Sequence, residues 1–125
     1  MLVVSYKSMT LRGTGTSRFK TEALMQVWDE YEVSGLTGRP HADCIHHIEG
    51  RSGKYNNSIV NAVPLLNQEE NIAQHGLLSK HETKVKLFKY VLKRLAQRGY
   101  EFTDEDRAFV DSSAACREAL LELSK

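Results

Sequence analysis

Three short stretches of the chain place histidine and asparagine side chains at spacings that suit chemistry on a bound metal ion. These stretches are residues 43–51, 61–66 and 71–76. Adjacent residues of a strand point to opposite faces, so the neighbouring His46 and His47 cannot do the same job. Residues four apart share one face of a helix, which places Asn71 and His75 on the same side.

Two strands followed by a helix could bring one of the paired histidines next to Asn71 and His75. Two imidazoles and one amide could then hold a divalent cation of intermediate hardness. The other histidine would stand nearby as a base, because an unperturbed imidazole titrates near neutral pH. The competing interpretation is structural, since a single histidine on an apolar strand usually serves packing.

Hydrophobic periodicity predicts the elements that would position these residues. The fold class that follows is α+β, mostly helical, with a small β-hairpin in the middle of the chain. Pro64 restricts the second strand of this hairpin to an edge or an end. The predicted elements are a helix over residues 16–33, a turn over 36–40, strands over 42–48 and 59–66, a short helix from 67 or 68 to Gly76, a helix over 80–98 that Gly99 terminates, a helix capped by Thr103, and a last helix capped by Ser112 or Ser113 that ends near Leu123.

The length of 125 residues fits one compact domain. We expect an N-terminal arm or short strand over residues 1–15 and a single domain over 16–125, with C-terminal helices over 80–125. No run of residues approaches the length of an apolar membrane span, and the first ten residues lack the pattern of a secretory signal. Cys44 and Cys116 lie far apart in sequence and form no CxxC pair, so reduced thiols and a cytoplasmic location are expected.

The near-neutral net charge conceals an asymmetry along the chain. Residues 1–98 hold 14 of the 17 Lys and Arg residues but only 9 of the 16 Asp and Glu residues. Residues 99–125 hold the remaining 3 basic and 7 acidic residues. A basic body with an acidic tail could bind a polyanion without a high overall pI. The competing interpretation is that these charges lie on ordinary solvated helix faces.

The motif residues resemble a known family. The order His-His-Ile followed by Gly-Arg, then Asn-x-Val-Pro-Leu, then Asn-x-x-x-His-Gly is similar to the HNH endonucleases. The similarity covers about residues 35–76, and the segment His46–Arg51 looks like phage and bacterial members. It implies a ββα-metal fold with flanking helices. It also implies a location in the cytoplasm of a bacterium or of a phage-infected host. The implied activity is metal-dependent hydrolysis of DNA phosphodiester bonds to 5′-phosphate and 3′-hydroxyl ends.

The resemblance also implies a role for each residue of the hairpin. His46 would be a metal ligand. His47 would be the general base that removes a proton from the attacking water. Asn61 would be structural, because its amide would tie down the loop and orient His47.

In the helix that completes the ββα motif, the resemblance matches Asn71 to a metal ligand. It matches His75 to a ligand of the metal or of the scissile phosphate. The gap before Asn71 is one residue longer than the family pattern, so Glu70 is an alternative ligand. Mg²⁺ is the expected ion, with Mn²⁺ or Zn²⁺ as alternatives. The CxxC knuckles that hold a structural zinc in many members are missing here, so no structural zinc is expected.

Basic residues near the motif are candidates for DNA contacts. Arg51 and Lys54, in the loop after the histidines, would bind phosphates of the DNA backbone. Lys84 and Lys89, on the helix over residues 80–98, would add further phosphate contacts. Such contacts position the DNA backbone and read no sequence. A homodimer through the C-terminal helices is possible. Three rival interpretations stay open: a non-catalytic DNA-binding or recombination accessory protein, an RNase or toxin-like nuclease on the same scaffold, and a helical interaction module.

Overall fold

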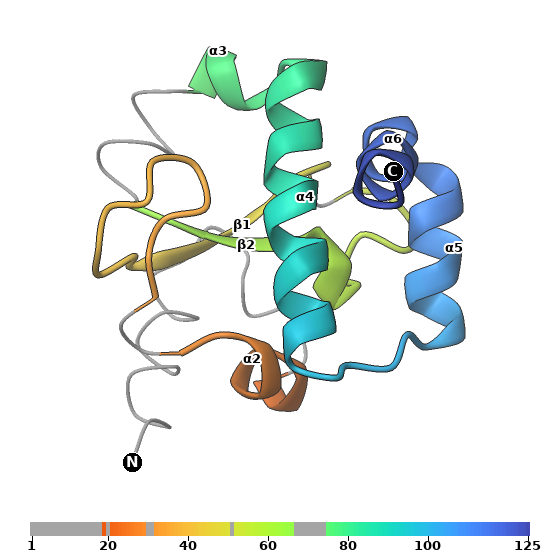
Figure 1. Ribbon diagram of the computed structural model, residues 1–125, viewed down its shortest axis with the longest axis horizontal. Helices are drawn as coiled ribbons and strands as arrows, with labels where there is room; N and C mark the ends of the chain where they lie inside the picture. Colours follow the sequence, from red (N-terminus) through yellow and green to blue (C-terminus); the bar gives the residue numbers. More distant parts are fainter. Residues whose placement is uncertain (1–18, 20, 30–31, 51, 67–74) are drawn as a thin grey trace.

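The computed structural model describes residues 19, 21–29, 32–50, 52–66 and 75–125. The described part is a mixture of helices and one small antiparallel sheet, which confirms the mostly helical α+β class (Figure 1). Every described helix is too short or too polar to span a membrane. The elements are α2 (Thr21–Val27), β1 (Cys44–His47), the 3-10 helix η2 (Ile59–Asn61), β2 (Ala62–Leu65), α3 (His75–Leu78), α4 (His81–Gln97), α5 (Asp104–Ser112) and α6 (Ala114–Leu123).

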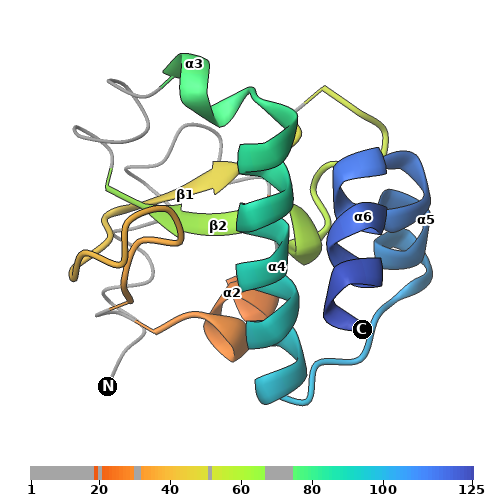
Figure 2. The ribbon, with the colours of Figure 1, turned by 45° about the horizontal axis from the view of Figure 1, so that its top comes forward.

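Helix α4 is the central support of the molecule. It crosses in front of the hairpin in Figure 1, and the turned view of Figure 2 shows α5 and α6 side by side along its flank. It packs against α6, η2 and β2, so the core lies where hairpin and C-terminal helices meet it. The five residues predicted to form its apolar face recur at helical spacing and are all buried: Val85, Phe88, Val91, Leu92 and Leu95.

The ends of the C-terminal helices follow from local side-chain chemistry. Gly99 has a φ of +65°, the left-handed conformation that commonly ends a helix, and it directly follows Arg98, the C-cap of α4. Thr103 caps α5 in a capping box with Asp106. Ser113 caps α6 by accepting a hydrogen bond from the backbone N–H of Cys116. These three predicted boundaries are confirmed.

The hairpin pairs β1 with β2 in an antiparallel register that sets Ile45 opposite Pro64 and His46 opposite Val63. Among the described residues the sheet has two strands, both of them edges, in agreement with the edge position predicted for Pro64. Its carbonyl accepts a hydrogen bond from the N–H of Gly35 at 2.9 Å, so the turn over residues 35–37 lies against β2. A Cβ on Gly35 would stand 2.5 Å from Cγ2 of Val63, and only glycine fits this approach.

The predicted helix over residues 16–33 is wrong in its extent, since α2 ends at Val27. Tertiary contacts after that point hold the chain in a different path. The guanidinium of Arg94 lies over the ring of Trp28 at 4.9 Å and donates to the carbonyl of Val27 at 2.9 Å. It also bonds the buried carboxylate of Glu32, which in turn accepts from the N–H of Asp29 at 3.1 Å.

Other predicted boundaries change or fall outside the described residues. The second strand is shorter than predicted, because η2 takes up residues 59–61. The short helix does not close at Gly76, since α3 continues to Leu78. Its predicted start at residue 67 or 68 and the N-terminal arm over 1–15 lie outside the described residues.

Candidate active site

The loop that joins β1 to β2 is held by two asparagine amides. Asn61, which is fully buried, accepts the N–H of Glu49 at 2.8 Å and donates to the carbonyls of Gly50 at 3.2 Å and Asn56 at 2.9 Å. Asn56 donates its own amide to the carbonyls of Glu49 and Gly50, at 3.2 and 3.1 Å. Both N–H groups of the Asn61 side chain are therefore bonded, and the backbone of residues 49–50 is held from two sides.

Glycines at two positions allow this loop to close tightly. Gly50 has a φ of +82° and donates its N–H to the carbonyl of His47 at 3.1 Å, so the chain turns as soon as β1 ends. A Cβ on Gly53 would stand 2.4 Å from Oδ1 of Asn56. The sequence between the two strands thus fixes the backbone that follows His47.

His47 lies at the end of β1 with 3% of its surface exposed. The ring of Phe19 is stacked on its imidazole, with the centroids 4.1 Å apart and the planes 19° from parallel. Stacking covers a face of the imidazole and leaves the ring edge, where both nitrogens lie, for hydrogen bonding. The sequence pattern marked Phe19 only as one member of an apolar stripe, so this contact with His47 was missed.

His46 is half-buried and lies on the opposite face of β1 from His47. Of the expected ligands, Asn71 and the alternative Glu70 lie outside the described residues, and α3 begins at His75, whose side chain is not described. Within the described ranges, no group of three His, Cys, Asp or Glu side chains is placed to hold a metal. The expected donor set, two imidazoles and one amide oxygen, nevertheless has the chemistry of a divalent-cation site, and His46 is not sealed in the core.

The expected DNA-contacting residues occupy different environments. Arg51 lies outside the described residues, and Lys54 is exposed, with its Nζ 5.3 Å from the centroid of the Tyr55 ring. Lys84 bonds the Glu49 carboxylate at 2.8 Å, and Lys89 forms an ion pair with Glu122 of α6. Carboxylates far away in sequence therefore offset part of the charge that the sequence pattern assigned to phosphate binding.

Glu49 connects the loop to the C-terminal helices. Its carboxylate accepts from Nζ of Lys84 at 2.8 Å and from Oγ of Ser113 at 2.5 Å. Partial burial by itself would raise the pKa of this carboxyl, but the hydrogen bonds from Lys84 and Ser113, together with the Lys84 charge, outweigh burial and lower it. Glu49 was not singled out from sequence, because both partners lie in distant helices.

An open hollow of about 400 Å³ lies beside this loop. The loop contributes Glu49, Lys54 and Tyr55 to its wall, and the corner between α5 and α6 contributes Ser112 and Ser113. A hollow of this size is in the range of ligand sites in proteins. No protein-family model matches the chain, and neither the curated proteins nor the solved structures that were compared with it gave a match.

Proposed function

We propose that the chain is a metal-dependent DNA endonuclease of the HNH type, in which His47 is the general base. The observation that carries the proposal is the Asn61 amide, which holds the loop directly behind His47 through three hydrogen bonds. The paired histidines at the end of β1 and the antiparallel pairing with β2 are further support. The resemblance of residues 35–76 to the HNH endonucleases supplies the assignment of roles.

In this proposal His46 and two residues of the following segment, Asn71 and His75, would hold the cation, with Glu70 as the alternative to Asn71. A bound Mg²⁺, or Mn²⁺ or Zn²⁺ in its place, would stabilise negative charge on the phosphoryl oxygens and on the departing 3′ oxygen. His47 accepts the proton of the attacking water, a contribution typically worth about 10²- to 10⁴-fold in rate. The products are a 5′-phosphate and a 3′-hydroxyl.

The surroundings of His47 suit a base that keeps one orientation. Phe19 covers one imidazole face, and the bonds from Asn61 to Glu49 and Gly50 fix the backbone that follows. With 3% of its surface exposed, His47 meets little bulk water. Lys54, exposed beside the hollow, is available to a phosphate of the DNA strand.

The test is nicking of supercoiled plasmid by the purified chain in Mg²⁺, Mn²⁺ or Zn²⁺. His47→Ala should lower the nicking rate by about 100-fold or more while DNA binding, followed by fluorescence anisotropy, stays nearly intact. Because Phe19 packs on this imidazole, His47→Gln is a second variant that keeps most of the side-chain volume. Thermal melting of both variants separates loss of chemistry from loss of folding.

His81→Ala is the matched control, since His81 is an exposed histidine of α4 that bonds Glu118. It should nick like the unaltered chain. Equal nicking rates for the unaltered chain and His47→Gln would show that His47 is not the general base. Binding of DNA without cleavage in any of the three metals would favour an accessory protein instead, and cleavage of labelled RNA alone would favour an RNase.

A further inference from the structure

Glu49 stands two residues after His47, and its polar groups are engaged on both the backbone and the side chain. Its N–H donates to Asn61, and its carbonyl accepts from Asn56. Its two carboxylate oxygens accept from Lys84 and Ser113. One residue of the loop is therefore joined to the end of η2, to α4 and to the start of α6.

The carboxylate contacts are placed where they matter energetically. The side chains of Lys84 and Glu49 are 25% and 20% exposed, so their ion pair is partly withdrawn from water. The Ser113 hydroxyl donates to Glu49 while it accepts from the N–H of Cys116, so the cap of α6 and the contact to the loop depend on one oxygen. A substitution of Ser113 at the beginning of α6 would therefore also remove a hydrogen bond to the loop.

The packing of α4 on α6 does not need this contact. An ion pair between Lys89 and Glu122 and a hydrogen bond between His81 and Glu118 already join the two helices, and apolar residues such as Phe88 and Ala119 fill the core. The pair between Lys84 and Glu49 differs, because it reaches from α4 to the loop behind His47. Its position indicates a task at the loop rather than between the helices.

We propose that Glu49 is a positioning residue that fixes the loop after β1 against α4 and α6 and thereby sets the orientation of the His47 imidazole. The catalytic consequence rests on the proposed function, whereas the effect on the imidazole does not. In this inference the main role of Lys84 is to hold Glu49 through their ion pair, and not to bind a phosphate.

The experiment compares Glu49→Ala and Glu49→Gln with the unaltered full-length chain. Single-turnover nicking measures the rate, anisotropy measures DNA affinity, and the imidazole nitrogen resonances of His47, assigned with His47→Gln, report its environment by NMR. Glu49→Ala should lower the nicking rate by about 10- to 100-fold with DNA affinity unchanged, and it should shift the His47 resonances. Glu49→Gln should have a nicking rate between those of Glu49→Ala and the unaltered chain, because its amide oxygen can still accept a hydrogen bond from Lys84.

Glu118→Gln is the matched control, since it alters a carboxylate at the same junction of α4 and α6 that bonds His81. It should leave both the rate and the His47 resonances unchanged. The inference is overturned if the Glu49 variants match the unaltered chain in rate and resonances, or if Glu118→Gln has the same effects. If the unaltered chain does not nick DNA but the His47 resonances respond to Glu49 alone, the proposed function fails and the positioning of the imidazole stands.

Discussion

The ring of Phe19 covers one face of the His47 imidazole, so a residue that precedes α2 packs on the end of β1. Both side chains are 3% exposed, and neither can turn without disturbing the other. The contact joins the N-terminal part of the described chain to the candidate base.

Phe19→Leu should therefore lower nicking more than its effect on folding explains. The smaller side chain leaves the imidazole face partly uncovered and allows the ring to move away from its productive orientation. Phe109→Leu is the control, because Phe109 is a buried phenylalanine that packs on Phe88 instead. Nicking rates and melting temperatures of the two variants check the prediction. Equal loss of nicking at equal loss of stability would contradict it.

Asn61→Ala should both destabilise the fold and abolish nicking. The substitution removes three hydrogen bonds and leaves the N–H of Glu49 and two carbonyls without this partner, which should cost about 3 kcal/mol in the free energy of unfolding. Urea denaturation measures this loss. Gln97→Ala, an exposed amide at the end of α4, should change the stability little. A stable Asn61→Ala variant would mean that Asn56 alone is sufficient to hold the loop.

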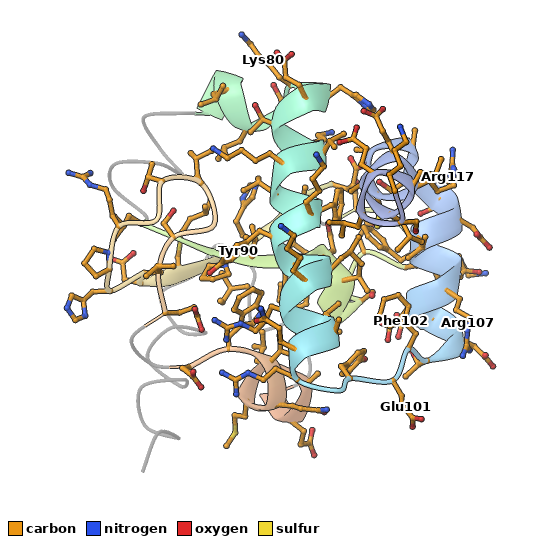
Figure 3. The ribbon with its side chains drawn as sticks, viewed as in Figure 1. Lys80, Tyr90, Glu101, Phe102, Arg107 and Arg117 are labelled. Carbon is orange, nitrogen blue, oxygen red and sulfur yellow. The ribbon has the colours of Figure 1, made fainter. Side chains whose placement is uncertain are left out.

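Substituting alanine for Gly35 should destabilise the protein, whereas Gly76→Ala should not. The new Cβ at Gly35 would meet Cγ2 of Val63 at 2.5 Å and Cδ2 of Tyr90 at 3.0 Å, and both β2 and α4 would have to shift. Tyr90 is labelled in Figure 3, where it extends from α4 over the hairpin. Gly76 lies in α3 with nothing within 4 Å of its Cβ position, so alanine there should stabilise the helix by about 0.5–1 kcal/mol. Melting curves that rank the two variants in the reverse order would refute the prediction.

Stability should fall above pH 10, in part through Tyr100. Burial and the hydrogen bond to Asp106, 2.6 Å long, raise the pKa of this phenol in the folded state. A raised folded pKa gives a contribution that is complete below the unfolded value of about 10 and is lost as the pH rises above it.

Tyr100→Phe tests this directly. It removes the hydrogen bond, worth about 1 kcal/mol near neutral pH, and it cannot ionise. The difference in the free energy of unfolding between the unaltered chain and Tyr100→Phe should shrink from pH 9 to pH 11. A constant difference across this range would show that Tyr100 does not contribute to alkaline unfolding.

The parts of the fold that local chemistry decides were predictable from sequence. Helix α4 has apolar residues at helical spacing and a terminal glycine, and Thr103 and Ser113 cap the next two helices with their own side chains. The hairpin also followed from local pattern. In each case the determining contacts lie within about one helical turn or between neighbouring strands.

The predicted extent of the first helix failed because it depends on contacts between distant residues. The early end of α2 reflects Arg94, which reaches across from α4 to Trp28 and Glu32. The candidate site divides in the same way. The bonds of Asn61 join residues within one loop, whereas the pairing of Lys84 with Glu49 and the stacking of Phe19 on His47 span 35 and 28 positions in the sequence.

The turn at Gly35 has a consequence for how the molecule meets other copies of itself. In a strand the nitrogen and the carbonyl of one residue point to the same side, so Pro64 directs both toward the margin of β2 that faces away from β1. The carbonyl is occupied by Gly35, and a proline nitrogen carries no hydrogen to offer. An additional strand would find neither a donor nor an available acceptor at this position. At Pro64 the outer margin of β2 is thereby a poor template for the edge-to-edge association that leads to aggregation.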